Sequence, residues 1–267
     1  MTGKFHSDIK IKKRKTKFFK KLGLFLIFSV SLIFVIFLAD VFSTALTAGS
    51  FSFVLNKQNF VSIKEKNLYA ITMGESTDKF QAFNIGGGVS VLGAGGFVWE
   101  ENGKYYVVAN IYENSSEANK ILNGLNESNY EVDVMEIKIP RVKLSFENLN
   151  GEYVKDIQNA LNRLYGLYED LYNLAINIDT KNITFIQGGS LVNGYKSECK
   201  IIYNKLLLIN SGYDNSKIKQ ISDTYVYVIE MLDTLVYKLL KDGQLNYIVK
   251  NAEIELVYKL YGLIKTL

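Results

Sequence analysis

Residues 97–112 read FVWEENGKYYVVANIY, and this stretch decides the fold of the middle of the chain. Two runs rich in β-branched and aromatic residues lie on either side of Asn102 and Gly103. An Asn-Gly pair between two such runs is a strong signal for a β-hairpin. The stretch therefore predicts two antiparallel strands joined by a tight turn.

Further elements are predicted on both sides of this hairpin. Residues 68–73 (LYAITM) and 130–137 (YEVDVMEI) have the composition and alternation of strands. Residues 78–83 predict a short helix, and residues 114–117 begin a second helix with apolar residues at helical spacing. Residues 67–139 therefore have the predicted order β-α-β-β-α-β.

A glycine-rich stretch lies between the first predicted helix and the hairpin. It contains neither a P-loop motif nor a dinucleotide-binding motif placed between a strand and a helix. We therefore expect a flexible connection and a close strand entry rather than a phosphate site, at Gly86, Gly87, Gly88, Gly93, Gly95 and Gly96.

Residues 67–139 resemble a SPOR (sporulation-related repeat) domain. The resemblance covers about a quarter of the chain and is carried by residues 69–74 (YAITMG), 95–99 (GGFVW), 105–109 (YYVVA), Tyr112 and 115–118 (SSEA). It implies a small antiparallel sheet backed by helices that binds peptidoglycan, typically glycan strands stripped of stem peptides. Thr72 stands where the family often has Gln, and residues 74–76 (GES) depart from its Gly-Ser/Ala-Phe-like element. Both departures bear on the glycan site rather than on the fold.

Side-chain alternation then suggests where a sugar would bind, because successive residues of a strand point to opposite faces. One face of the second hairpin strand carries Tyr106, Val108 and Asn110, and the other is more uniformly apolar and is expected to pack on the helices. Aromatic surface and hydrogen bonds for a sugar are therefore expected from Thr72, Trp99, Tyr106 and Asn110. The alternative is that Trp99 and the tyrosines are packing residues.

An apolar run without charge begins at Leu22 and ends at Ala39. At about 1.5 Å per residue it spans roughly 27 Å, close to the ~30 Å hydrocarbon core of a bilayer. Residues 1–21 contain nine Lys/Arg and one acid, so the positive-inside rule places this tail in the cytoplasm and the following body outside. The alternative is a cleaved signal peptide with a small-residue site at 43–45, although the run exceeds the usual core of about 7–15 residues. Both interpretations export the body.

Composition excludes several functional classes. His6 is the only histidine and Cys199 the only cysteine, so no Ser-His-Asp triad, Cys-His pair or His-ligated metal site fits outside the tail. We therefore expect no enzyme activity, no metal and no cofactor. Residues 22–267 contain 22 basic and 26 acidic residues, which argues against nucleic acid as a partner of the body.

Residues 150–267 change to an amphipathic pattern in which apolar residues recur at steps of three and four. Breaks fall near residues 179–189, 210–215 and 242–243. The pattern predicts three or four helices in an antiparallel bundle.

The sequence as a whole predicts an α+β protein. Its predicted parts are a basic cytoplasmic tail (1–21), a transmembrane helix (22–42), a linker (43–66), a SPOR-like antiparallel sheet domain backed by helices (67–139) and an all-α helical bundle (140–267). The expected protein is a single-pass protein of the cell membrane that binds peptidoglycan in division or sporulation, with envelope or divisome proteins as candidate partners. The alternative is a non-catalytic envelope scaffold whose sheet and bundle bind a protein partner.

Overall fold

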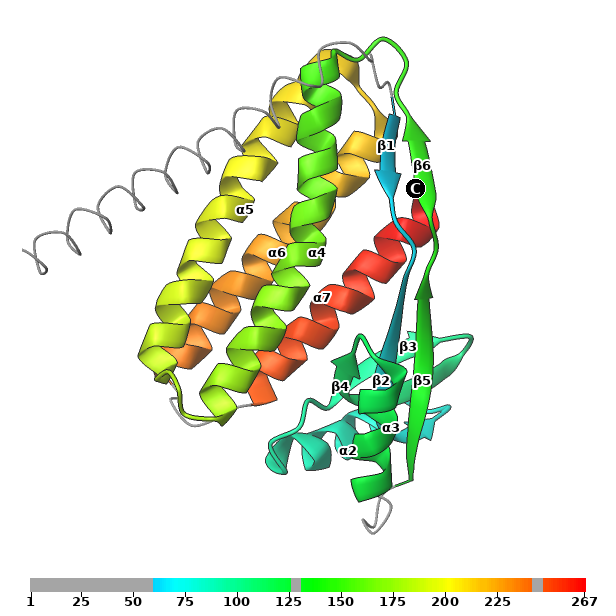
Figure 1. The fold of residues 1–267 in the computed structure, drawn as a ribbon, viewed down its shortest axis with the longest axis vertical. Helices are drawn as coiled ribbons and strands as arrows, with labels where there is room; N and C mark the ends of the chain where they lie inside the picture. Colours follow the sequence, from blue (N-terminus) through cyan, green and yellow to red (C-terminus); the bar gives the residue numbers. More distant parts are fainter. Residues whose placement is uncertain (1–59, 126–130, 242–246) are drawn as a thin grey trace, which may run out of the picture. The chain divides into compact units, whose positions relative to one another are not determined.

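The computed structural model describes residues 60–125, 131–241 and 247–267 (Figure 1). The basic tail, the apolar run from Leu22 to Ala39 and most of the linker lie outside these residues. Within the described part, no helix combines the length and the apolar character needed to cross a bilayer. The α+β class is confirmed, because a small antiparallel sheet with helices is followed by a helical region.

The sheet has four strands in the order β3-β4-β2-β5, and each neighbouring pair is antiparallel. Its elements are β2 (Lys66–Ser76), α2 (Lys79–Val91), β3 (Phe97–Glu101), β4 (Lys104–Tyr112), α3 (Ser115–Leu125) and β5 (Val132–Ile139). This is the predicted β-α-β-β-α-β order, and the topology is that of a ferredoxin-like split βαβ unit. Both helices pack on one face of the sheet, over Ile71, Met73, Val107 and Ala109.

The hairpin between β3 and β4 forms as the sequence predicts. Asn102 has φ 52° and Gly103 has φ 77°, so both turn residues adopt the left-handed conformation that a two-residue hairpin of this kind requires. Asn and Gly adopt it at lower cost than other residues, which is why this pair sets the turn.

Helix α2 is longer than expected, because it includes Gly86, Gly87 and Gly88. A Cβ atom on Gly86 would lie 2.4 Å from the carbonyl oxygen of Gly96, so only glycine lets the helix lie this close to the start of β3. The expected flexible connection at residues 86–88 is therefore wrong, since close packing outweighs the low helix propensity of glycine. A close strand entry does occur at Gly95, whose N–H donates to the Ala109 carbonyl oxygen at 2.8 Å.

The end of the expected linker forms a strand. β1 (Phe60–Ile63) pairs antiparallel with β6 (Val142–Ser145), and the register continues from β1 into β2 and from β5 into β6. Glu65 therefore stands opposite Pro140, and the ladder is interrupted there because proline has no N–H to donate. This two-stranded ribbon runs from the sheet onto the bundle, where α4 packs against β1 (Figure 1).

Four helices form the bundle, at the upper end of the predicted number. They are α4 (Gly151–Asp179), α5 (Phe185–Tyr213), α6 (Ser216–Lys241) and α7 (Tyr247–Thr266). Each packs against the next, and α7 packs against α4, so the four helices close around one core. The predicted start of α6 is confirmed, because Asn215 Oδ1 accepts from the N–H groups of Lys217 and Ile218.

One apolar core is shared by the sheet and the bundle. Trp99, Val108 and Ile111 of the sheet belong to the same buried cluster as Leu164 of α4 and Leu256 of α7. The sheet is thus covered by α2 and α3 on one face and by the bundle on part of the other, and residues 58–267 form one compact unit. The boundary between residues 139 and 140 remains a prediction about independent folding.

Candidate functional site

The four residues predicted to form a glycan site do not share one exposed face. Thr72, Trp99 and Tyr106 lie on the face turned toward the bundle, where Thr72 is 6% exposed, Trp99 is 1% exposed and Tyr106 is half-buried. Asn110 lies on the opposite face, with α2 and α3. The expected grouping on one solvent-facing surface is therefore wrong, for two separate reasons.

The first reason is a β-bulge in β4. Ile71 stands opposite Asn110 but Thr72 stands opposite Val108, so Ala109 is an extra residue in the ladder. An extra residue reverses the alternation of side chains beyond it. Asn110 therefore lies on the helix-covered face, where its Nδ2 donates to the Tyr112 hydroxyl at 3.0 Å.

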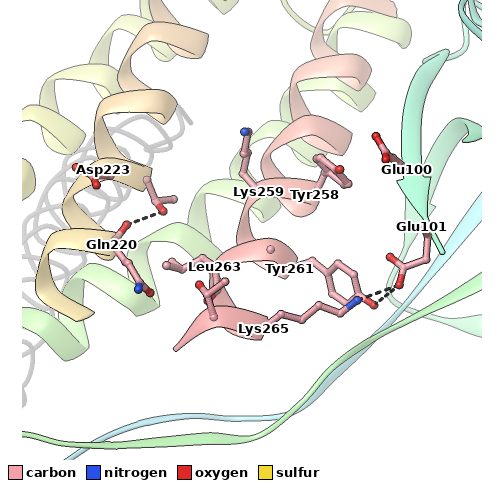
Figure 2. Close-up of a pocket in the computed structure, with 12 residues that line it drawn as sticks. Glu100, Glu101, Gln220, Asp223, Tyr258, Lys259, Tyr261, Leu263 and Lys265 are labelled. Carbon is pink, nitrogen blue, oxygen red and sulfur yellow. Dashed lines mark hydrogen bonds and ion pairs between the residues drawn. The ribbon is translucent and has the colours of Figure 1, made fainter. Parts of the chain in front are cut away.

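The second reason is the last helix of the bundle. Trp99 packs edge-on against Tyr258 of α7 with ring centroids 4.9 Å apart, and Tyr261 lies 5.6 Å away. Tyr258 also contacts Phe97, with a centroid distance of 5.5 Å. Figure 2 shows Tyr258 and Tyr261 of α7 beside the end of β3. Trp99 is thus a core residue, and the packing alternative applies to it.

The same sheet face remains open at the other end. A hollow of about 290 Å³ lies over the ends of β2, β4 and β5 and is lined by Thr72, Gly74, Glu75, Tyr106, Glu131, Asp133 and Met135. Two of the four predicted site residues, Thr72 and Tyr106, therefore meet in one concave surface. Sequence reasoning missed the three carboxylates, although Asp133 would follow from the register, since it stands opposite Thr72.

Polar contacts fix the walls of this hollow. The Thr72 hydroxyl donates to the Asp133 carbonyl oxygen at 3.3 Å, which joins β2 to β5. The Lys104 ammonium lies 2.8 Å from Glu75 Oε1, and this contact raises the pKa of Lys104. Gly74, at φ 117°, lies where the β2–β4 register shifts, and this backbone conformation is readily adopted only by glycine.

The hollow has the chemistry of a hydroxyl-rich ligand site. Tyr106 offers an aromatic surface, and the carboxylates of Glu75, Glu131 and Asp133 accept hydrogen bonds. Its volume is near the lower limit of ordinary small-molecule sites, which run from about 300 to 1,000 Å³. A sugar, with apolar C–H faces and many O–H and N–H donors, matches this combination.

Other chemistry has little support among the described residues. No cluster of three or more His, Cys, Asp or Glu side chains suited to a metal ion occurs in the ranges 60–125, 131–241 and 247–267. Cys199 is fully buried on α5, and burial raises the pKa of its thiol to about 11. At neutral pH this cysteine is therefore a protonated packing residue.

Comparison with known proteins adds no relative. No family model matches the chain, no curated protein matches it, and no solved structure matches it. What the chain binds is therefore inferred from its own residues.

Proposed function

We propose that this chain is a membrane-anchored protein of the cell envelope that binds peptidoglycan glycan strands through its SPOR-like sheet domain, in cell division or sporulation. The apolar run from Leu22 to Ala39 anchors it as a single span, with the basic tail in the cytoplasm and the body outside. The protein is a binding protein rather than an enzyme.

The hollow beside Tyr106 is the observation that carries this proposal. Most of the sheet is covered by helices on both faces, so a glycan has room at the open ends of β2, β4 and β5. There the aromatic ring of Tyr106 lies beside three hydrogen-bond-accepting carboxylates. A few such contacts around one aromatic anchor account for most of the affinity in many interfaces.

Two tyrosines that follow each other on β4 provide a matched test. Tyr106 lines the hollow, whereas Tyr105 lies on the face covered by α2, and both are half-buried. We expect Tyr106→Ala in the full chain to weaken retention on purified sacculi by about tenfold to hundredfold, which corresponds to about 1–3 kcal/mol. Tyr105→Ala should leave retention unchanged, and thermal melting of both variants controls for folding. Equal retention of the two folded variants would exclude the hollow as the glycan site.

A specific observation favours the scaffold as a second candidate function. Helix α2 exposes two phenyl rings to solvent, with Phe80 75% exposed and Phe83 55% exposed. Exposed aromatic residues are typical of surfaces that bind proteins. If this function is correct, the parent chain should not bind sacculi, and capture of an envelope protein should be lost on changing both phenylalanines to serine. Sacculus binding by the parent chain would favour the glycan function.

A further inference from the structure

A second pocket, of about 450 Å³, lies between β3, α6 and α7. Figure 2 shows Lys259 and Tyr261 of α7 between the acidic end of β3 on one side and α6 with Asp223 on the other. Tyr258 contributes its ring to the wall and packs its other contacts on Trp99. The pocket is therefore built on the rigid junction of sheet and bundle, and it is separate from the hollow beside Tyr106.

Both lysines of this pocket already have partners. The Lys265 ammonium lies 2.9 Å from Glu101 Oε1 and 4.1 Å from the centre of the Tyr261 ring. The Lys259 ammonium lies 4.0 Å from the centre of the Tyr227 ring. The pair formed by Lys265 and Glu101 shows how this site accommodates an ammonium group, against a carboxylate and an aromatic ring at once.

The groups without partners are hydrogen-bond acceptors. Glu100 and Asp223 are exposed on opposite walls, and neither forms an ion pair with any residue that the structure describes. Gln220 Oε1 is buried and receives no hydrogen bond from the described residues. The Thr224 hydroxyl uses its proton on the Gln220 carbonyl oxygen at 2.9 Å, which leaves its lone pairs free. The open capacity of the pocket therefore complements a cation with several donors.

We propose that this pocket binds the free amino group of a wall peptide, as a primary ammonium held between Glu100 and Asp223. An ammonium has three donors and no acceptor, which matches two carboxylates and an unpartnered amide oxygen. The ring of Tyr258 adds a surface that attracts a cation. An anion would meet the two carboxylates, and a neutral sugar would leave their charges unpaired. The choice of a wall peptide as the source of the amine rests on the proposed function; the ammonium chemistry rests on the pocket.

The ammonium chemistry is tested with a defined probe on the full chain in detergent. The probe is acetyl-alanyl-lysyl-alanine amide, and its control is the same peptide with the lysine amine acetylated. Trp99 is the only tryptophan and packs behind Tyr258 and Tyr261, so its fluorescence reports on the pocket. We expect saturable binding of the amine probe alone, weakened at low salt by about tenfold or more when Glu100→Gln and Asp223→Asn are combined.

The matched control is Glu147→Gln, which neutralises an exposed carboxyl outside the pocket. It should leave the affinity for the amine probe unchanged, since the substituted side chain does not line the site. Equal binding of the acetylated probe, or an equal loss of affinity in Glu147→Gln, would overturn the proposal. Both pocket substitutions fall on exposed side chains, so the fold is expected to tolerate them.

The wall as the source of the amine is tested on sacculi before and after acetylation of their amino groups. Retention of the parent chain should fall on acetylated sacculi, and retention of the Glu100→Gln, Asp223→Asn variant should be the same on both. Unchanged retention of the parent chain would exclude the wall peptide. The outcome is independent of the glycan hollow, because that hollow is tested by Tyr106→Ala, which leaves this pocket intact.

Discussion

Replacing the buried carboxyl of Glu253 should make the protein more stable at neutral pH. Glu253 lies on α7 with 0% of its surface exposed, and neither carboxyl oxygen has a hydrogen-bond partner among the described residues. Burial raises its pKa well above the ordinary value of 4.5, and the charge of Lys250 opposes this shift. Around the carboxyl lie phenols whose own pKa values it raises, Tyr112 of β4 and Tyr168 and Tyr172 of α4.

The direction of the pH effect follows from proton binding. Above pH 4.5 the unfolded chain loses the proton of Glu253, whereas the folded chain keeps it up to its raised pKa. The folded state then binds more protons, so the free energy of unfolding falls as pH rises through this window. The loss is about 1.4 kcal/mol per pH unit, and below pH 4.5 the contribution of this group is constant.

Glu253→Gln removes this titration while keeping the size of the side chain. We expect the variant to gain stability over the parent as pH rises above 4.5, by about 1.4 kcal/mol per unit up to the folded-state pKa. For a chain of this size that is about 3–6 °C in Tm per pH unit. The assay is thermal unfolding of both proteins between pH 4 and pH 8.

An exposed carboxyl on α6 provides the control. Glu230→Gln should follow the parent at every pH, because its side chain is in water in both states. If the difference in Tm between Glu253→Gln and the parent were constant from pH 4 to pH 8, the carboxyl would not be held protonated in the folded state. If the variant were less stable than the parent at pH 7, Glu253 would have a stabilising partner that outweighs its burial.

Two further predictions concern packing. Trp99→Ala should lower the free energy of unfolding by about 3–5 kcal/mol in chemical denaturation, because it empties the contact between β3 and α7. Gly86→Ala should destabilise by about 1–3 kcal/mol, since its Cβ would lie 2.4 Å from a backbone oxygen, whereas Gly87→Ala, with nothing within 4 Å, should stabilise by about 0.5–1 kcal/mol in the same helix. Equal effects of the two alanines would show that α2 does not lie this close to β3.

Local rules predicted the elements whose conformation depends on a few neighbouring residues. Asn102 and Gly103 set the hairpin because both must adopt positive φ, and few other pairs do so at low cost. The repeat of apolar residues at steps of three and four predicted the bundle, because one apolar stripe per helix must be buried. The predicted break near residues 210–215 matches Asp214, which ends α5 at φ 41°.

The candidate site could not be predicted in the same way. The bulge at Ala109 leaves no mark in an otherwise regular strand, yet it moves Asn110 to the other face. The cover over Trp99 comes from α7, about 160 residues further along the chain, and no local pattern pairs the two elements. Face assignments from alternation therefore hold only where the register is unbroken and the sheet has no partner from elsewhere in the chain.

The shared core decides how binding experiments on this protein should be interpreted. Trp99 was the most prominent candidate for stacking on a sugar, and its replacement should indeed reduce sacculus binding, because the junction of sheet and bundle loosens. That loss would not identify a glycan contact, since the ring is 1% exposed and no ligand reaches it. Tyr106 is the informative position, because it is half-buried beside an open hollow and has Tyr105 as its neighbour on the other face. A loss of binding confined to Tyr106→Ala, with unchanged melting, is the result that separates a contact with the wall from a change in the fold.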